Sequence, residues 1–562
     1  MSTSSKKNRQ TSGNTGKVKK EQTTKYKFHS GWFWGLALLL AITYVVYSPA
    51  LKNGITGWDD KDYIVENKVI QHLDADFFHK SFAFHTGFVM GNYHPITMLS
   101  YALEYKFSKL KPETFHRTNL ILHLLNGLLV FLFVWLICKR ELVALISSAL
   151  FLLHPMHVES VAWIAERKDL LYCFFELASL SAYILFVRSG KNKYYIFCFV
   201  FFLMALLSKA MAVAMVGILP LLDFYFNRNL RSRKVILEKI PFLLTGIFFG
   251  LVAVAAQKEF ESIASDLHPM SDRILFADYS FITYIWKSIF PINLNCFYDY
   301  PLPGTYSWYF LYVLLSAILL TAVFFTLKKT KIIFFGFFFF TFSVALVLQL
   351  LPVGGAILAE RYSYIPYIGI FYMIGEGIYF LLNRKSAKAF STNPVLVYIP
   401  FAICVIALSY ISHERCKVWK DTISIWDDVL NANPNVVKAY AGRGQGYNDR
   451  QQYTEAIKDF NKALELKNDY ADVYYNRGLS YYYLGKQLHD NGRLPEAQQY
   501  YQLSIDDNSS AIRYKPNLAR AYFNRSGNYY LLKQYPLALQ DALKAKELGM
   551  EVDEAYIRVL QK

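Results

Sequence analysis

Apolar runs of about twenty residues recur along this chain from Gly31 to Ser412, and each can cross roughly 30 Å of membrane hydrocarbon as a helix. Lipid offers the backbone no hydrogen-bond partners, so such runs satisfy their own N–H and C=O groups as helices. This constraint excludes a water-soluble fold for residues 29–412. We predict eleven membrane helices, at residues 31–50, 117–138, 141–163, 169–187, 194–208, 211–226, 235–256, 307–327, 332–351, 363–382 and 394–412.

The short links on one side of these predicted helices are basic. They are Lys139-Arg140, Arg188 to Lys193, Arg228 to Lys234, Lys328 to Lys331 and Arg384 to Lys388. Basic residues are retained in the cytoplasm, so these links are predicted to be cytoplasmic. The longer segments 51–115 and 257–306 lack a basic excess and are predicted to lie outside. Within the second, residues 273–294 are apolar but contain Asp278 and Lys287, so we expect a re-entrant or interfacial segment.

The net charge of +17 is concentrated in residues 1–28 and in the cytoplasmic links, which is typical of membrane topology and contact with anionic lipid. No aromatic-basic module accompanies the charge, so nucleic-acid binding is not indicated. Residues 1–28 are almost free of apolar side chains and are predicted to be a disordered cytoplasmic tail. The six cysteines form no CxxC pair, which argues against a zinc knuckle and a disulfide framework.

A 34-residue repeat follows the last apolar run. Ala439 to Gly444 aligns with Val473 to Gly478, and a third copy begins at Ala519. This is the period of the tetratricopeptide repeat, a pair of packed helices. We therefore predict an all-α chain, with a membrane domain at 29–412 and an extracytoplasmic α-solenoid at 413–562. Residues 413–435 are interpreted as a half-repeat, and the second copy is stretched around residues 487–517.

The first outer segment opens with the adjacent acids Asp59 and Asp60, close to a membrane exit. One carboxylate of such a pair can act as a general base while the other raises its pKa by like-charge repulsion. The alternative is a solvated turn.

Five cations do not follow the positive-inside pattern and lie at the predicted outer mouths of different helices. They are Arg117, Arg167, Lys168, Lys209 and Arg361. Cations retained there suggest an anion site, and a phosphate would form charge-assisted hydrogen bonds with them. The alternatives are structural pairing with nearby acids and side chains that extend to the interface.

Further polar residues are predicted to line a cavity at these outer mouths. They are His94, His116, Asn119, His154, His157, Glu159, Glu360 and Tyr362. His116, Asn119, His123 and Asn126 share one helix face, and hydrogen bonds between helices are the alternative for this stripe. His154, His157 and Glu159 resemble metal ligands only superficially, because Pro155 separates the histidines and HExxH is absent. We expect no metal.

Several segments together are similar to the transmembrane and tetratricopeptide-repeat O-mannosyltransferase-like family, in its bacterial form. They read WDDKDYI, YHPITMLSYALE, RTNLILHLLN, LHPMHVESVAWIAERKDLL, SKAMAVAMVGILPLLDFY and ERYSYIPYIG. The resemblance implies the GT-C glycosyltransferase fold in a bacterial inner membrane. It also implies a polyprenyl-phosphate sugar as donor, a Ser or Thr hydroxyl of an envelope or secreted protein as acceptor, and no cofactor.

In such proteins an acid of the first outer loop deprotonates or orients the acceptor hydroxyl. This role falls on Asp59 or Asp60, which the sequence does not separate, with Asp60 slightly preferred. Arg361, then Arg117 and Arg167, are the expected phosphate ligands, and the repeats are expected to bind the protein acceptor. The alternative is a non-catalytic membrane-anchored scaffold that assembles envelope proteins through its repeats.

Overall fold

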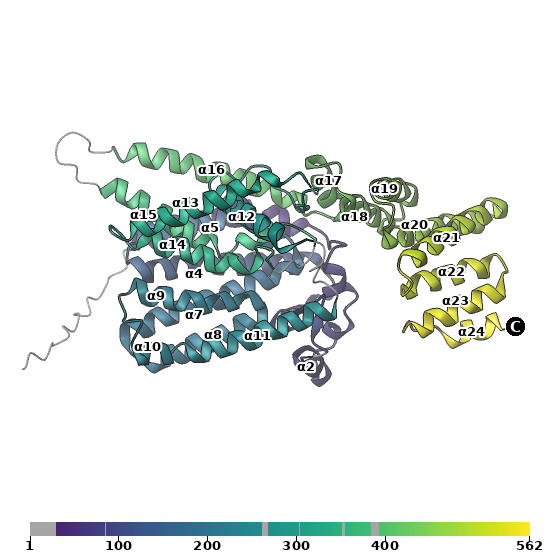
Figure 1. Ribbon diagram of the computed structural model, residues 1–562, viewed down its shortest axis with the longest axis horizontal. Helices are drawn as coiled ribbons and strands as arrows, with labels where there is room; N and C mark the ends of the chain where they lie inside the picture. The colour runs from purple at the N-terminus through teal and green to yellow at the C-terminus, as the bar shows by residue number, and fades with distance from the viewer. Residues whose placement is uncertain are drawn as a thin grey trace, which may run out of the picture.

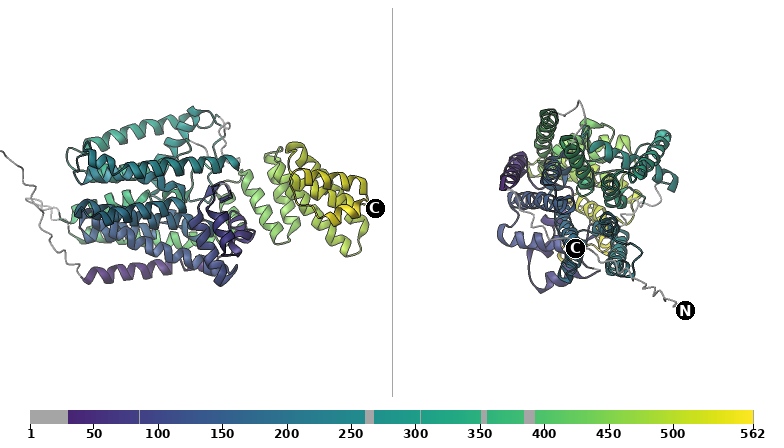
Figure 2. Two further views of the ribbon diagram at one scale, coloured as in Figure 1. Left: turned by 90° about the horizontal axis from the view of Figure 1, so that it is seen from below. Right: turned by 90° about the vertical axis from the view of Figure 1, so that its left-hand side faces the viewer.

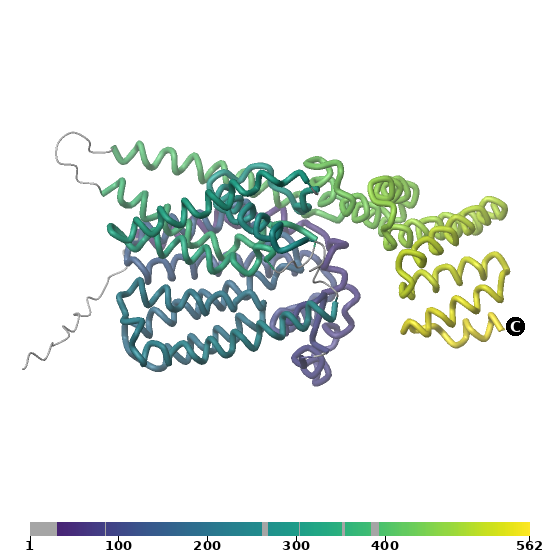
Figure 3. Tube along the Cα trace, viewed as in Figure 1, coloured from purple at the N-terminus to yellow at the C-terminus, as the bar shows by residue number. Residues whose placement is uncertain are grey.

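A computed structural model describes residues 30–84, 86–260, 268–302, 304–350, 355–383 and 393–561. It has a bundle of long helices with an array of shorter helix pairs at one end (Figure 1). The tube trace in Figure 3 follows the chain through the bundle and then into the array. The left-hand view of Figure 2, turned by 90°, shows the same separation. The predicted order of an all-α membrane bundle followed by helical repeats is confirmed.

Among the described residues, five helical segments have the length and composition to cross a membrane. They are Pro112–Cys138 (α4), Ile164–Ser189 (η5 with α7, Arg167–Ser189), Arg233–Glu259 (α10, Arg233–Leu237, with α11, Ile240–Glu259), Ser307–Thr326 (η7 with α13, Phe310–Thr326) and Val395–Val418 (α16). A sixth is the bent pair of Glu141–Leu153 (α5) and Pro155–Ala162 (η4 with α6, Val158–Ala162).

Shorter apolar helices occupy the remaining predicted membrane segments. They are Ser30–Val46 (α1), Asn192–Ser208 (α8), Ala210–Tyr225 (η6 with α9, Met215–Tyr225), Ile332–Val347 (α14, Ile332–Val344, with η8) and Tyr367–Asn383 (α15). In the bundle, α4 packs on α5 and α7, α7 on α8, and α15 on α5 and α14. Each of the eleven predicted segments therefore contains an apolar helix, although length alone qualifies only five or six of them as spans.

The helix predicted to run unbroken over 141–163 is instead bent by 58° between α5 and η4. Pro155 lies at the break, where it removes a backbone donor and clashes with the preceding turn. The Nδ1 atom of His154 accepts a hydrogen bond from the N–H of Met156 at 3.3 Å and caps the new turn. The break sets the short α6, which carries Glu159, at a new angle beneath the outer loop.

The first outer segment contains short elements. They are η1 (Ser48–Lys52), η2 (Lys61–Val65), η3 (Lys68–Gln71), α2 (Ala75–Phe82), the antiparallel strands β1 (Phe88–Val89) and β2 (Asn92–Tyr93), and α3 (Pro95–Ser108). The second contains α12 (Met270–Lys287), which is not among the apolar spans of the described chain. Ser280 and Tyr284 of α12 donate to the carbonyls of Ile357 and Ala359 at 3.1 and 2.9 Å, so α12 packs against the segment before η9 (Glu360–Ser363).

The two classes of connecting segment lie on different sides. On the basic side, Lys331 donates to the carbonyl of Phe224 at 2.7 Å and Arg188 to that of Ile137 at 3.5 Å. On the other, the N–H of Gly54 donates to the carbonyl of Lys420 at 2.9 Å, which joins the first outer segment to the repeats. The orientation of these sides in the cell stays a prediction, and residues 1–28 and Arg384 to Lys388 lie outside the described residues.

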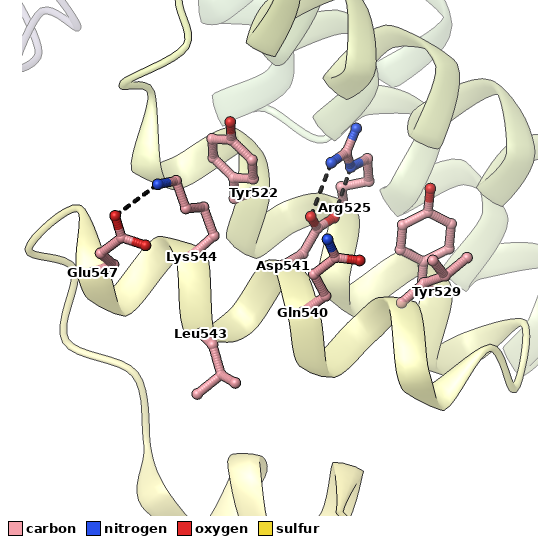
Figure 4. A pocket seen from close by; sticks show the side chains of 9 residues that line it. Tyr522, Arg525, Tyr529, Gln540, Asp541, Leu543, Lys544 and Glu547 are labelled. Atoms are coloured by element: carbon pink, nitrogen blue, oxygen red, sulfur yellow. Dashed lines mark hydrogen bonds and ion pairs between the residues drawn. The ribbon is translucent and has the colours of Figure 1, made fainter.

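The array consists of α17 (Thr422–Ala432), α18 (Val437–Asp449), α19 (Tyr453–Leu466), α20 (Ala471–Asp490), α21 (Leu494–Tyr514), α22 (Ala519–Leu531), α23 (Tyr535–Glu547) and α24 (Glu554–Leu560). The stretch predicted in the second repeat extends α20 and α21, which have 20 and 21 residues. One arginine per repeat bonds bidentately to an aspartate of its partner helix: Arg443 to Asp459, Arg477 to Asp507 and Arg525 to Asp541 (the last in Figure 4). These repeated pairs fix the helix spacing.

Two helical glycines of the array provide a matched test of its packing. A methyl group on Gly442 of α18 would lie 2.2 Å from the Trp426 ring of α17, whereas one on Gly527 of α22 would meet nothing within 4 Å. Gly442→Ala should cost about 1–3 kcal/mol through overpacking, and Gly527→Ala should be neutral or stabilise the helix by about 0.5–1 kcal/mol. Melting followed by tryptophan fluorescence will test this, and equal melting of the two variants would contradict it.

Candidate active site

Asp60 is completely buried and fixes the first outer loop to the bundle. Its Oδ2 accepts hydrogen bonds from the N–H and hydroxyl of Thr56 at 2.9 and 2.8 Å. Its Oδ1 accepts one from the N–H of Ala165 in η5 at 2.7 Å. Burial raises the pKa of Asp60 to about 6 although these hydrogen bonds oppose the shift. Both oxygens are therefore engaged in holding the loop on the start of α7.

Asp59 is the more accessible of the two acids, with 23% of its side chain exposed. Its Oδ2 lies 4.0 Å from the Nζ of Lys168 at the start of α7. Burial raises the pKa of Asp59, and Lys168 partly offsets that shift. An accessible carboxylate with a raised pKa is suited to take a proton. The geometry therefore favours Asp59 as the base, against the slight preference for Asp60 drawn from the sequence.

Three of the five outer cations converge on one buried carboxylate, that of Glu166. Lys168 and Lys209 approach it at 3.2 and 3.5 Å, and the Nε of Arg361 at 3.3 Å. They come from the start of α7, the end of α8 and η9. Lys209 also pairs with Asp169, and Arg361 with Glu159. We call these three cations with Asp59, Glu159, Glu166 and Asp169 the outer charge cluster.

The other two predicted phosphate ligands do not join the outer charge cluster. Arg167 is fully buried and donates to the Asn119 side chain at 2.8 Å and the Phe115 carbonyl at 3.0 Å. It also forms an ion pair with Glu104 at 2.6 Å. Arg117 is exposed and has no ion pair within the described ranges. Arg167 therefore forms structural pairs, which was the alternative to phosphate binding. Its neighbour Lys168 can still reach the cluster because successive residues of a helix point about 100° apart.

Glu360 faces away from its neighbour Arg361. Its Oε1 accepts from the N–H of Asn295 at 2.6 Å and the Tyr298 hydroxyl at 2.8 Å, and its Oε2 lies 3.6 Å from Arg415 of α16. Arg415 also pairs with Asp428 of α17 at 2.8 Å. Sequence reasoning missed Arg415, whose one signal is a cation at the outer end of the last membrane helix.

The polar stripe on α4 forms hydrogen bonds between helices and to the outer loop. His116 contacts the carbonyl of Gly54 at 3.2 Å, and Asn119 donates to that of Trp163 at 3.2 Å. Deeper in the bundle, His123 contacts the Tyr364 hydroxyl at 2.7 Å and Asn126 donates to Leu170 at 2.9 Å. The alternative for this stripe, structural pairing, thus accounts for its contacts.

Some of the remaining predicted cavity residues pack inside the bundle, and the others lie beside the outer charge cluster. The buried His154 and His157 lie among aromatic rings. Burial and the nearby Lys168 and Lys209 lower the pKa of the buried His94 to about 3. The Tyr362 ring lies beneath Arg361 at 4.8 Å. Within the described part of the chain no group of three His, Cys, Asp or Glu side chains is arranged to hold a metal ion.

A stack of tryptophans links the acidic loop to the repeats. Trp58, next to Asp59, lies between Trp163 of the membrane domain at 5.0 Å and Trp426 of α17 at 4.8 Å. Trp163 in turn stacks on Trp419 at 5.2 Å. The wall of the site next to Asp59 is therefore built partly by the repeat array.

Comparison with known proteins finds a matching repeat family and similar sequences. The TPR repeat family profile matches residues 444–485. Human Protein O-mannosyl-transferase TMTC3 is 25% identical over 442 residues, covering 69% of this chain and 46% of the relative. Caenorhabditis elegans Protein O-mannosyl-transferase F38B6.6 is 24% identical over 481 residues, covering 80% and 65%. The resemblance drawn from the sequence is confirmed, although the chain spans only about half to two thirds of these relatives.

Among solved structures, ArnT from Cupriavidus metallidurans bound to undecaprenyl phosphate aligns with 92% of this chain and 80% of its own, at 11% identity. The TM-score is 0.38.

The anchoring role of Asp60 can be tested against its exposed neighbour Asp62. Asp60→Ala leaves three buried donors without an acceptor, each at a cost of about 1–3 kcal/mol. The melting temperature of Asp60→Ala should therefore lie well below that of the wild type, whereas that of Asp62→Ala should equal the wild-type value. Melting of the purified proteins in detergent measures the difference. An unchanged Asp60→Ala melting temperature would show that the loop is held elsewhere.

Proposed function

We propose that this protein is a membrane glycosyltransferase that moves a sugar from a polyprenyl phosphate to a Ser or Thr hydroxyl of a protein. The observation that carries the proposal is the accessible Asp59 beside three converging cations at the outer end of the bundle. The relatives named as protein O-mannosyl-transferases make mannose the first sugar to test. No metal or organic cofactor is part of this proposal.

In the proposed reaction the hydroxyl oxygen of the acceptor attacks the anomeric carbon of the sugar. Asp59 accepts the proton that this hydroxyl loses. The bond between that carbon and the phosphate oxygen breaks, and the lipid phosphate leaves with the electron pair. Preorganised cations stabilise charge where it develops, and Lys168, Lys209 and Arg361 are fixed by Glu166. Protonation of Asp59 removes its charge from Lys168, whose attraction for the departing phosphate then increases.

The cost of the outer charge cluster argues against the alternative of a non-catalytic anchor. Moving several ions from water into a buried site costs free energy that ion pairing often only just recovers. Glu159, Glu166 and Asp169 are all buried there. A membrane anchor needs only apolar helices, so stability alone gives no reason for such a cluster. The concentration of charge at one outer mouth favours a site that handles an anion.

Asp59→Asn provides the direct test of this chemistry. The variant should transfer mannose from polyprenyl-phosphate mannose about 10²–10⁴-fold more slowly, the scale of lost general base catalysis, while still binding the donor. In the wild type, transfer should fall as pH drops through the raised pKa of Asp59, because only the carboxylate accepts a proton. Lys168→Met removes the cation that opposes that shift and should move this limb to higher pH. A fully active Asp59→Asn protein would place the base elsewhere.

The repeats are proposed to bind the protein acceptor. A depression on their surface allows this proposal to be tested in the full-length chain. The depression, of about 520 Å³, lies between α22 and α23 (Figure 4), and the exposed Leu537 and Leu543 are among the residues that line it. Replacing both leucines by Ser should raise KM for the protein acceptor about thirtyfold, because two apolar contacts of about 1 kcal/mol each together lose about 2 kcal/mol. Donor hydrolysis should be unchanged. Leu503→Ser alters an exposed leucine of α21 and serves as control. An unchanged KM would exclude this depression from acceptor binding.

A further inference from the structure

The first repeat helix places a lysine beside the acidic loop. Lys438 is the second residue of α18 and is half-buried. Its ammonium lies 4.7 Å from the centre of the Phe297 ring and 5.4 Å from that of Trp58. Phe297 belongs to the second outer segment and Trp58 precedes Asp59. Lys438 therefore sits where both outer segments and the repeats meet.

Among the described residues the ammonium of Lys438 has neither a hydrogen bond nor an ion pair within 4.0 Å. The groups whose charge acts on it are Asp59, Arg361 and the exposed Asp299. Burial lowers the pKa of Lys438, which Asp59 and Asp299 oppose and Arg361 reinforces. A half-buried ammonium with aromatic faces as its nearest contacts keeps three N–H donors free for a ligand.

Arg361 contacts the tryptophan that packs against Trp58. Its guanidinium lies 5.4 Å from the Trp163 ring, which contacts Trp58 beneath Lys438. Two cations thus flank the Trp58–Asp59 corner, one from the membrane domain and one from the repeat array. The charge of Arg361 acts unfavourably on Lys438, and an anion bound between the two cations would offset this repulsion.

A lysine at position 438 is not needed to hold the repeats against the membrane domain. The backbone bond from Gly54 to Lys420, the bond from Gly57 to the Thr422 hydroxyl at 2.7 Å and the Arg415–Asp428 pair already join the two parts. An apolar side chain at position 438 would pack on Trp58 and Phe297 without the cost of burying a charge.

We propose that Lys438 binds the phosphate of the lipid-linked donor together with Arg361, so that the membrane domain and the first repeat share one active site. This inference rests on the proposed function and adds a donor ligand from the repeat array. A deletion of residues 436–562 would remove Lys438 and the α18 face packed on Trp426, so it should weaken donor binding as well as transfer.

The test compares full-length wild type, Lys438→Met, Lys438→Arg and Lys458→Met in lipid nanodiscs. Lys458 is an exposed lysine of α19 and serves as the matched control. Binding is measured with undecaprenyl phosphate and with undecaprenol, which lacks the phosphate. Lys438→Met should weaken binding of the phosphate lipid about tenfold or more, the scale of one charge-assisted hydrogen bond, and leave undecaprenol binding unchanged. Lys438→Arg should retain most of the affinity, and Lys458→Met all of it.

A second measurement uses the wild type alone and does not depend on how the variants fold. Undecaprenyl phosphate should protect Lys438, and not Lys458, from acetylation detected by mass spectrometry. The inference alone is overturned if wild type binds undecaprenyl phosphate and transfers mannose while Lys438→Met binds equally and Lys438 stays unprotected. If wild type neither binds the phosphate lipid nor transfers the sugar, the proposed function fails and the inference with it.

Discussion

The carboxylate of Glu166 is the constraint on which the rest of the site depends. It is buried at the start of α7 and receives Lys168, Lys209 and Arg361, which come from three separate segments. Without it, three cations at one outer mouth would repel one another and be driven toward water. With it, the three cations are held together, and Asp59, Asp169 and Glu159 each approach one of them as a second acidic partner. The break in the third membrane segment at Pro155 contributes Glu159 as a second partner for Arg361. The bend in the backbone therefore helps to fix the position of the cations.

The same corner of the molecule joins the membrane bundle to the repeats. The last membrane helix, α16, continues without interruption to Val418, and α17 begins four residues later. Trp58 is held between rings of both parts, and Asp60 fixes the loop that carries it. The short connection and these contacts leave the first repeat packed directly against the acidic loop. On the proposed function, a protein acceptor bound along the repeats is thus brought to the base without a flexible linker, which raises its effective concentration there.

The sequence predicted features that depend on local periodicity and missed those that depend on packing. Apolar length, basic links and the 34-residue period identified the helices, the two sides and the repeats, because each is repeated many times along the chain. Neighbouring residues with the same chemistry were not separable. Arg167 and Lys168 differ by one position, yet one binds Asn119 inside the bundle and the other reaches Glu166. Asp59 and Asp60 diverge in the same way. Lys438 was missed because only the packing of α18 against the outer segments brings its charge close to Asp59.

The balance of charge explains why a repeat helix would supply part of a membrane active site. In the membrane domain the outer charge cluster has four carboxylates, Asp59, Glu159, Glu166 and Asp169, against three cations. Such a site, when fully ionised, carries one excess negative charge, which a further cation or a proton on Asp59 would offset before a phosphate binds. Lys438 adds the fourth cation, and on the proposed mechanism the proton taken up by Asp59 then leaves a net positive charge as the lipid phosphate departs. A site balanced in this way binds the leaving group most tightly at the moment of transfer, which is the condition for catalysis rather than for simple binding.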